Sequence, residues 1–500
     1  MRDGAITDIV IVGGGTAGWI AASALAKLMG DTVSIRLVES DAIGTVGVGE
    51  ATIPQIRRLN QTLGIDEREF LAKTHGTVKL GIEFNNWGGQ GESYFHTFGD
   101  AGINFHGVHF HHYWRRWAES HPDSDYWDYS LHHRAAYVGK FAHLERVGNT
   151  SMTGLAYAYH FDAGAYALYL RELAEGLGVV RTEGIVEAVE QDAETGFVTA
   201  VTLASGERIS GELFIDCTGF RGLLIDAVGS PYLDWSNYLP ANRAVAVGCE
   251  RTDPLLPLTK ATARDAGWQW RIPLRHRTGN GHVFCDAFIT PEAAETTLLA
   301  NLDGDPLGSP KHLRFTTGRR EHLWHKNVVS LGLASGFLEP LESTSIHIIQ
   351  SNVSRLIELF PDRGFDPANI AEYNRVVAKE YDLIRDFLIL HYKLTRRDDT
   401  EFWRHCREME VPDSLLHKME LFKASGHLFR DADDLFRESS WVQVMLGQGL
   451  RPESWHRRAD RLDDAQLADL MGSVKALVEK AVAPLPAHAE FLERYVGKAV

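Results

Sequence analysis

The feature that most constrains the fold is a glycine-rich turn close to the start of the chain. Residues 7–12, Thr-Asp-Ile-Val-Ile-Val, form a β-branched apolar run that predicts a buried strand. Glycines follow, and residues 19–28 are rich in Ala and Leu, as is typical of a helix. Residues 33–38 predict a second strand. The order strand, turn, helix, strand is the unit that builds a parallel, doubly wound sheet.

The turn reads Gly-Gly-Gly-Thr-Ala-Gly and matches the G-x-G-x-x-G pattern of dinucleotide-binding proteins. Its first glycine makes the tight turn, the second lets the backbone approach a pyrophosphate, and the third permits close helix–strand contact. Glu39 ends the second strand, where an acid can bind the two ribose hydroxyls. A glycine-rich turn without a ligand is the alternative. The candidate cofactor-binding residues here are Gly13, Gly15, Thr16, Ala17, Gly18 and Glu39.

Two later segments favour FAD over NAD as the dinucleotide. Residues 213–222, Leu-Phe-Ile-Asp-Cys-Thr-Gly-Phe-Arg-Gly, resemble the strand that closes over the nucleotide in the glutathione-reductase type of FAD fold. Residues 327–336 resemble the later segment that meets the flavin, with Leu333 and Gly336 as candidate contacts. Only one complete G-x-G-x-x-G is found. The flavin is therefore expected to be reduced by another protein, or by a nicotinamide that binds without such a module.

Composition limits the partners and the compartment. The formal net charge of −16 argues against nucleic acid, whose phosphates need a basic face, and against an anionic membrane surface. The four cysteines are widely spaced, which suggests neither a zinc site nor a disulfide framework. No apolar stretch approaches the ~20 residues that span a bilayer, and the first residues lack a signal pattern. A cytoplasmic location is expected.

The rest of the chain predicts an α/β fold in which several regions pack as one body. Residues 83–150 are rich in aromatics and histidines and predict an irregular, substrate-facing excursion; residues 240–320 predict strands. From about residue 366 apolar residues recur at helical spacing. The expected fold is the FAD-binding glutathione-reductase type, similar to FAD monooxygenases, with a mixed substrate region and a C-terminal helical region. The expected domains are an FAD-binding domain (1–365) with interleaved substrate-facing segments (about 83–210 and 230–320), and a helical substrate-covering region (366–500).

One motif makes the resemblance to a family specific. Residues 267–273 contain W-x-W-x-I-P, formed by Trp268, Trp270, Ile272 and Pro273. At this point the chain resembles the flavin-dependent tryptophan halogenases, in which the motif is a signature. Other segments agree with the family patterns: Gly13–Trp19, the flavin strap Val48–Pro54 with Gly49 and Ala51, residues 77–84 with Lys79, and residues 336–344 with Glu342.

The resemblance implies a reaction and its residues. Family members use reduced FAD and oxygen to oxidise a halide to hypohalous acid, which passes through a tunnel to the substrate. Lys79 would hold that acid, as a hydrogen-bonded species or a haloamine, and Glu342 would polarise the halogenating species or take the ring proton. The halide would lie against backbone amides near Thr344. Ser345 stands where the family usually has glycine, so bromide and chloride both stay open. The implied partners are a flavin reductase and a small aromatic substrate, and a homodimer is possible.

The resemblance also implies a substrate site with a departure from the family pattern. His96 and Phe98 match the residues that sandwich the indole ring, Ile53 and Pro54 belong to the strap, and Trp455 is a candidate aromatic wall. Tryptophan-accepting members carry a tyrosine pair and a nearby acid that grip the amino-acid end. Here residues 437–444 read Arg-Glu-Ser-Ser-Trp-Val-Gln-Val, without that pair. Indole, or another compact electron-rich aromatic, is therefore expected rather than free tryptophan.

Each candidate has a plainer interpretation. Lys79 could be a solvated surface charge, Glu342 part of a helix-capping segment, and the two tryptophans one face of an aromatic core. The histidines at positions 106, 109, 111 and 112 lack a companion ligand motif, so packing or a substrate layer is preferred over a metal. At the level of function, the alternatives are an aromatic hydroxylase on the same scaffold, or a FAD-fold binding protein without catalysis. The W-x-W-x-I-P motif and the Lys79/Glu342 pair favour the halogenase.

Overall fold

The computed structural model describes residues 4–43 and 49–498. Contacts between Cα atoms divide the chain into two compact units, each made of three separate stretches of sequence. The first unit comprises residues 1–76, 161–242 and 313–382, and the second comprises residues 77–160, 243–312 and 383–500.

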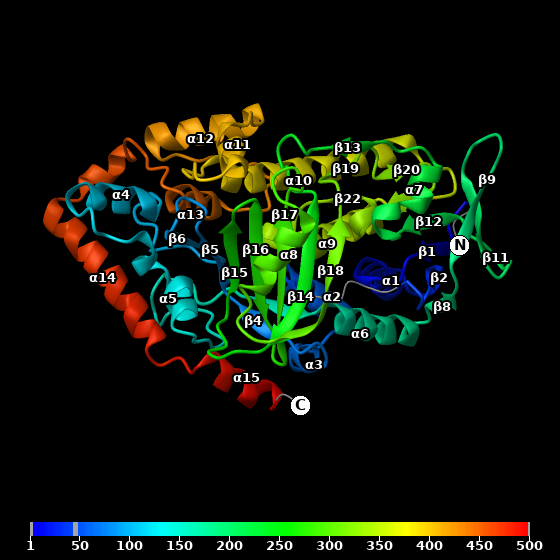
Figure 1. Cartoon of the computed structure of the whole chain (residues 1–500), viewed down its shortest axis with the longest axis horizontal. Coiled ribbons are helices and arrows are strands. Elements are labelled where there is room, and N and C mark those ends of the chain that lie inside the picture. Colours follow the sequence, from blue (N-terminus) through cyan, green and yellow to red (C-terminus); the bar gives the residue numbers. More distant parts are fainter. Residues whose placement is uncertain (1–3, 44–48, 499–500) are drawn as a thin grey trace. The chain divides into compact units, whose positions relative to one another are not determined.

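The first unit is built on a six-stranded sheet that is parallel except at one edge. The apolar N-terminal run becomes its central strand, and the chain then winds first to one side of that strand and later to the other (Figure 1). The glycine-rich turn therefore lies at the switch point of the sheet, where doubly wound folds bind ligands. In spatial order the strands are β20 (Trp324–His325), β21 (Val328–Ser330), β12 (Leu213–Asp216), β1 (Asp8–Val12), β2 (Ser34–Glu39) and β8 (Val180–Glu183).

Helix α1 (Thr16–Met29) follows β1 and is almost entirely buried between neighbours. It packs against α6 (Ala163–Gly176) and α9 (Ser345–Glu358). Its small alanines allow this close approach, which explains an Ala-rich sequence without a clear polar face. The remaining helices of this unit are α2 (Gln55–Leu63), α3 (Glu67–Lys73), α7 (Leu223–Ala227) and the first part of α10 (Pro367–Lys393).

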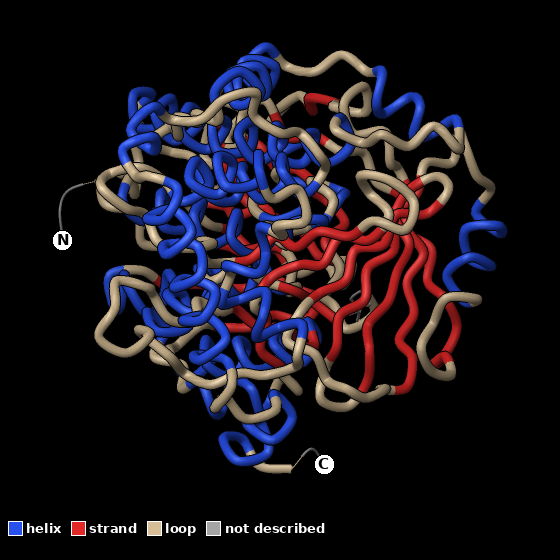
Figure 2. The backbone as a smooth tube through the Cα atoms, turned by 90° about the vertical axis from the view of Figure 1, so that its left-hand side faces the viewer, coloured by secondary structure: helices blue, strands red, loops and turns tan. Residues whose placement is uncertain are grey.

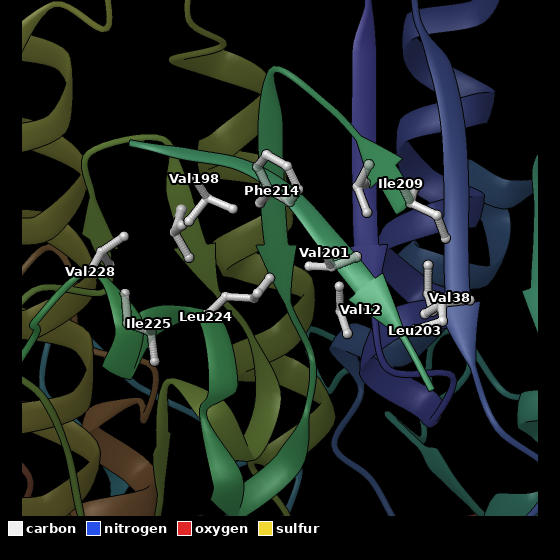
Figure 3. Packing of buried hydrophobic residues seen from close by; sticks show 12 residues of the cluster. Val12, Val38, Val198, Val201, Leu203, Ile209, Phe214, Leu224, Ile225 and Val228 are labelled. Carbon is white, nitrogen blue, oxygen red and sulfur yellow. The ribbon is translucent and has the colours of Figure 1, made fainter. Parts of the chain in front are cut away.

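A three-stranded antiparallel meander packs on the parallel sheet. Its residues Val198, Val201, Leu203 and Ile209 meet Phe214 and other buried side chains of the sheet (Figure 3). Along these strands more buried residues are interspersed with less buried ones, as is typical of strands that pack on one face. They are β9 (Val186–Gln191), β10 (Val198–Leu203) and β11 (Arg208–Ser210); a second small sheet holds β13 (Tyr232–Asp234), β19 (Gly318–Arg320) and β22 (Gly336–Phe337).

The second unit is built on a seven-stranded sheet that is largely antiparallel. The W-x-W-x-I-P motif forms its central strand, β16. Neighbouring strands twist relative to one another, as the red segments in Figure 2 show. Its order is β18 (Pro306–Arg314), β14 (Arg243–Glu250), β17 (Arg277–Phe284), β16 (Gly267–Pro273), β15 (Thr259–Arg264), β5 (Gly81–Asn85) and β6 (Ser93–Thr97). Beside this sheet, β4 (Thr77–Lys79) pairs antiparallel with β7 (Ala158–Asp162).

Helices surround the rest of the second unit. Residues 83–150 are more regular than the sequence predicted, because two helices there bury histidine and aromatic side chains instead of a plain aliphatic stripe. Among the described residues, no helix combines the length and apolar character needed to cross a membrane. The helices are α4 (Phe110–Ser120), α5 (Leu131–Tyr137), α8 (Pro291–Leu299), α11 (Glu401–Glu408), α12 (Asp413–Ser425), α13 (Glu438–Gly447), α14 (Asp464–Val482), α15 (His488–Val496) and the end of α10.

The Trp270 indole occupies a niche made by small residues on both neighbouring strands. It pairs with Ala261 on β15 and with Gly281 on β17. A Cβ atom on Gly281 would lie 2.0 Å from the Trp270 ring. Trp268, two residues earlier, is 1% exposed, and the two indole centroids are 6.1 Å apart. The motif is thus an aromatic layer of the core, and the small neighbours Ala261 and Gly281 leave the space that the Trp270 ring fills.

We predict that Gly281→Ala lowers the free energy of unfolding by about 1–3 kcal/mol, because the added methyl group must displace the Trp270 ring. The matched control is Gly248→Ala on β14 of the same sheet, where a Cβ meets only the flexible end of Arg277 at 3.0 Å. Urea unfolding of both variants checks this. Equal free energies of unfolding for the two variants would contradict the claim that Gly281 makes room for the Trp270 ring.

Candidate functional site

The glycine-rich turn is folded by contacts that only glycine permits. Gly13 has φ +110°, and a Cβ there would lie 2.2 Å from the carbonyl oxygen of Cys217. A Cβ at Gly18 would lie 1.9 Å from the carbonyl oxygen of Gly13. The first glycine thus brings β1 against β12, and the last brings α1 against the turn, as the motif predicted.

The middle glycine, Gly14, has a role that the motif did not predict. A Cβ at this position would overlap the carboxylate of Glu39, whose Oε2 lies 1.4 Å away. The other Glu39 oxygen accepts a hydrogen bond from Arg181 Nε at 2.7 Å. The triple glycine was the signal for this role. It lets the acid at the end of β2 lie directly beside the turn, with its orientation set by an arginine from β8.

Gly15 faces open space, and this provides the test of whether a dinucleotide fits. A Cβ at Gly15 would meet no atom within 4 Å, and its φ of −75° would suit any residue. Gly15 is the N-cap of α1, which has no side-chain cap and no acidic residue in its first turn. The amides of Thr16, Ala17 and Gly18 therefore begin a helix beside open space. This is the arrangement that binds a pyrophosphate, so the residues fit FAD.

Strand β12, predicted to close over the nucleotide, ends in a buried acid that organises the next turn. Asp216 accepts hydrogen bonds from the Leu224 and Ile225 amides at 2.8 and 2.9 Å, and from the Thr218 amide and hydroxyl at 2.9 and 2.7 Å. Burial raises the pKa of Asp216. These bonds shape the turn that follows β12. A further bond, from the Cys217 amide to the carbonyl of Val12, keeps this turn beside the glycine-rich turn.

The other predicted flavin contacts lie in two segments of the same unit. Gly49 and Ala51 bound strand β3 (Gly49–Ala51), while Val48 of the predicted strap lies outside the described residues. Ile53 is buried and Pro54 is the N-cap of α2. Leu333 lies in a 3-10 turn after β21 and is 38% exposed, unusually for a leucine, and Gly336 starts β22.

Glu342, Ser343 and Thr344 form a buried turn before α9. They are 1%, 3% and 1% exposed. Glu342 ends a short 3-10 helix, Ser343 has left-handed angles (φ 59°, ψ 39°), and Thr344 is the N-cap of α9 without a side-chain cap. Successive right- and left-handed residues turn their amides toward one point, which is the geometry of an anion-binding nest. Ser345 is the first residue of α9, and Glu342 lies two residues before the N-cap Thr344.

A carboxylate that sequence reasoning missed holds α9 in place. Glu380 on α10 accepts hydrogen bonds from Ser351 Oγ at 2.8 Å and His347 Nε2 at 3.0 Å, and it pairs with Arg355. Burial opposes its charge, but these donors lower the pKa of Glu380 to about 2. The charged form is therefore kept, and the helix that starts at the nest is fixed to its neighbour.

Lys79 is fully buried in the second unit, so the interpretation of a solvated surface charge is wrong. It ends β4 with 0% exposure, and its Nζ lies 5.3 Å from the centroid of the Phe98 ring. An ammonium over an aromatic face is stabilised by the ring quadrupole. The sequence assigned both residues to one site, and within this unit the structure brings them together.

His160, which sequence reasoning missed, connects the Lys79 strand to the tryptophan motif. The Thr77 hydroxyl donates to the carbonyl of Pro273 at 2.7 Å, so His160 Nδ1, 3.0 Å away, must donate to that hydroxyl. His160 Nε2 then accepts from Thr259 Oγ1 at 2.8 Å. Burial, and next the Lys79 charge, hold the pKa of His160 well below its usual value. The neutral imidazole therefore leaves Lys79 as the cation of this buried layer.

The candidate substrate residues have distinct surroundings. His96 is 4% exposed on β6, and its ring centroid lies 5.5 Å from that of Phe387 and 6.1 Å from that of Phe436. Trp455 donates from Nε1 to Asp460 at 2.8 Å and lies under the Arg115 guanidinium. His96 thus belongs to an aromatic cluster, whereas the role predicted for Trp455 in a substrate wall stays a prediction.

Of the four clustered histidines, His111 and His112 are buried in the first turn of α4, whereas His106 and His109 precede the helix and are exposed. His111 Nε2 bonds to the Gly426 carbonyl at 2.8 Å, and the His456 amide donates to His112 Nδ1 at 3.2 Å. Burial lowers the pKa of His111 to about 4 and that of His112 to about 2. In the part of the chain that the structure describes, no group of three or more His, Cys, Asp or Glu side chains is arranged to hold a metal ion. Packing accounts for these two histidines.

Comparison with known proteins agrees with this fold. The tryptophan halogenase family model matches residues 8–464. Tryptophan 7-halogenase RebH of Lentzea aerocolonigenes is 33% identical over 99% of this chain and 100% of its own length. The flavin-dependent halogenase Xcc4156 of Xanthomonas campestris is 49% identical with a TM-score of 0.95 over 98% of both chains. BrvH, a flavin-dependent halogenase of Brevundimonas sp. BAL3, is 43% identical with a TM-score of 0.94 over 98% of this chain and 99% of its own.

The fold and its dinucleotide turn define a flavoprotein oxidoreductase of the FAD-binding α/β class. Within that class, the chain belongs to the tryptophan halogenase family and is a flavin-dependent enzyme. The expected fold class and the family resemblance are thereby confirmed.

The contrast between two glycines of the turn gives a prediction. Gly15→Ala should leave the fold intact, because its Cβ meets nothing, but should weaken FAD binding by about tenfold or more, which is about 1.4 kcal/mol, because the methyl group enters the space before α1. Gly18→Ala should instead destabilise the protein itself, since its Cβ would lie 1.9 Å from Gly13 O. Flavin titration and thermal unfolding of the apoprotein check both. Parental FAD affinity in Gly15→Ala would contradict the placement of the phosphates.

Proposed function

We propose that the protein is a FADH2-dependent halogenase that uses oxygen and bromide or chloride to halogenate indole or an indole derivative. The observation that carries the proposal is Lys79, a lysine with 0% exposure and an aromatic ring 5.3 Å from its ammonium. Lysine is almost never fully buried, because taking its charge out of water is costly. A lysine buried beside an aromatic ring is therefore a candidate for a functional role, and we assign it halogen transfer.

The cofactor supplies the oxidation of the halide when it is bound: FADH2, O2, X⁻ and H⁺ give FAD, HOX and H2O. Gly13, Gly15, Thr16, Ala17 and Gly18 would hold its pyrophosphate and Glu39 its ribose. Gly49, Ala51, Leu333 and Gly336 would meet the flavin end. Electrons are proposed to come from a separate flavin reductase, since the sequence has only one complete dinucleotide motif.

The proposed role of Lys79 is to hold the hypohalous acid and polarise it. The ammonium donates a hydrogen bond to the oxygen of HOX, which makes the halogen more electrophilic. The aromatic carbon attacks the halogen, the O–X bond breaks, and loss of the ring proton restores aromaticity. The products are the aryl halide and water. Alternatively, Lys79 loses a proton and its neutral amine reacts with HOX to give a haloamine and water. The ring carbon then takes the halogen, the N–X bond breaks, and the ring proton returns to the nitrogen.

Glu342 is proposed to take the ring proton or to polarise the halogenating species. A buried carboxylate can act as a base because few water molecules compete for it. The turn at Thr344 and Ser345 is proposed as the halide site, supported by its left- and right-handed backbone angles. Ser345 adds a side chain beside that nest, so both bromide and chloride belong in the test.

Indole, rather than free tryptophan, is proposed as the type of substrate. His96 and Phe98 would sandwich the ring, with Ile53, Pro54 and Trp455 contributing further contacts. The support is the stretch at residues 437–444, which lacks the tyrosine pair expected of a site that grips an amino acid. Two relatives are named for tryptophan: RebH as a tryptophan 7-halogenase and ThaL as a tryptophan 6-halogenase.

Three further statements stay proposals from the sequence. The FAD-binding domain is proposed to comprise residues 1–365, with substrate-facing segments at about 83–210 and 230–320, and a helical substrate-covering region at 366–500. The protein is proposed to act in the cytoplasm. A homodimer is the proposed assembly.

Mass spectrometry of complete reactions tests the function. The reactions contain FAD, flavin reductase, NADH and oxygen, with bromide or chloride, and indole, tryptophan or a small panel of aromatics. A product shifted by the halogen mass, with its isotope pattern, is expected, with a larger turnover number for indole than for tryptophan. A product that gains one oxygen instead would assign the chain to the hydroxylases. Protein that neither reduces nor reoxidises flavin would favour a binding protein.

We predict that Lys79→Ala abolishes halogenation but leaves FAD binding and peroxide release at parental levels, because the ammonium acts after halide oxidation. Product formation is measured by mass spectrometry and peroxide by a peroxidase-coupled assay. The matched control is Lys73→Ala, which removes an exposed lysine of α3 that pairs with Glu172. A Lys79→Ala variant that halogenates at the parental rate would refute the assigned role.

A further inference from the structure

The peptide segment that carries Phe98 is held by a side chain more than 300 residues further along the chain. Gln443 lies on α13 and is 2% exposed. Its Oε1 accepts a hydrogen bond from the Thr97 amide at 2.7 Å, and its Nε2 donates to the Gly99 carbonyl at 3.1 Å. One carboxamide therefore binds the peptide groups on both sides of Phe98.

The orientation of the Gln443 amide follows from its partners. The Thr97 N–H can only donate and the Gly99 carbonyl can only accept, so Oε1 must face Thr97 and Nε2 must face Gly99. The Thr97 hydroxyl closes the same turn by donating to the Gly99 carbonyl at 2.6 Å. A carboxamide supplies the donor and the acceptor in one plane. A carboxylate would lose the donor, and a thioether would lose both.

The same turn is enclosed on its other side by an imidazole. A Cβ on Gly99 would lie 2.0 Å from Cε1 of His132, so only glycine fits beside that ring. His132 is 1% exposed, and its Nε2 accepts the Ala156 amide at 2.9 Å. The backbone at Phe98 is therefore held by Gln443 on one hand, and packed closely against the hydrogen-bonded ring of His132 on the other.

This turn determines where the Phe98 ring lies with respect to Lys79. The Phe98 amide donates to the carbonyl of Leu80, the residue after Lys79, at 3.1 Å. The ring centroid is 5.3 Å from the Lys79 ammonium. Because the ring face attracts the cation, a shift of the turn would shift the ring and remove a constraint on the ammonium.

We infer that Gln443 is a positioning residue for halogenation: it holds Phe98 against Lys79 and acts on the reaction through that ring. The inference rests on the proposed role of Lys79. Loss of the Gln443 amide would leave halide oxidation unchanged, and it would impair the capture of hypohalous acid by the lysine. Acid that is not captured would escape into solution.

The test uses the full-length enzyme with FAD, flavin reductase, NADH, bromide and indole. Gln443→Met is expected to lower kcat for bromoindole by up to about 100-fold, the cost of misplacing a catalytic group by about 1 Å, and to raise KM for indole, because Phe98 is also proposed to contact the substrate ring. Free hypobromous acid, trapped with monochlorodimedone, should rise as bromoindole falls. Gln443→Glu keeps the acceptor for Thr97 and loses the donor to Gly99, so its kcat should lie between those of the parent and Gln443→Met.

The matched control is Gln448→Met. Gln448 is 1% exposed at the end of α13, and its side chain donates to the His391 carbonyl instead. It should keep the parental ratio of bromoindole to trapped acid. A parental ratio in both Gln443 variants, or an equal loss in Gln448→Met, would overturn the positioning role. A parent enzyme that oxidises flavin but produces neither bromoindole nor hypobromous acid would instead overturn the proposed function, which separates the two failures.

Discussion

The close approach of backbone at the glycine-rich turn is the constraint on which the first unit depends. A Cβ at Gly13 or Gly18 would lie 2.2 or 1.9 Å from a carbonyl oxygen, so neither position admits a side chain. These contacts bring β12 beside β1 and set α1 against the turn. Because Gly14 has no side chain, Glu39 at the carboxyl end of β2 lies directly beside the turn. Gly15 leaves open space before the helix. A dinucleotide site and a packed sheet thus follow from one set of contacts.

The second unit buries a cation, the Lys79 ammonium. Lys79 ends the short strand β4, and the Thr77 hydroxyl of that strand donates to the carbonyl of Pro273 on β16 and accepts from His160 on β7. The imidazole is kept neutral, so it adds no second charge beside the ammonium. Trp268 and Trp270 form a buried aromatic layer on the adjoining sheet. These features connect the family motif to the lysine through structure, although the motif itself supplies no reacting group.

The network around Phe98 shows how a helix far along the chain can hold a backbone turn in another segment. Gln443 satisfies the two peptide groups that flank Phe98, and His132 limits the movement of Gly99. The stretch that contains Gln443 lacks the polar anchors expected for an amino-acid substrate. Its Gln443 instead binds the backbone on both sides of Phe98.

The sequence alone determined the parallel sheet, the glycine turn and the family, because strand periodicity, glycine spacing and the W-x-W-x-I-P motif are local in sequence. It also proposed Lys79, Phe98 and Glu342 as site residues from short motifs, and the structure brings Lys79 and Phe98 together. It did not predict the helices within residues 83–150, since their buried faces carry histidines and aromatics that mask the helical period. Nor could it find Glu380, His160, His132 or Gln443. Their roles arise from hydrogen bonds between residues far apart in the chain, as in the bond from Thr97 to Gln443. Only the tertiary structure decides such pairs, because buried peptide groups and charges take whichever partners the packing of distant elements brings within reach.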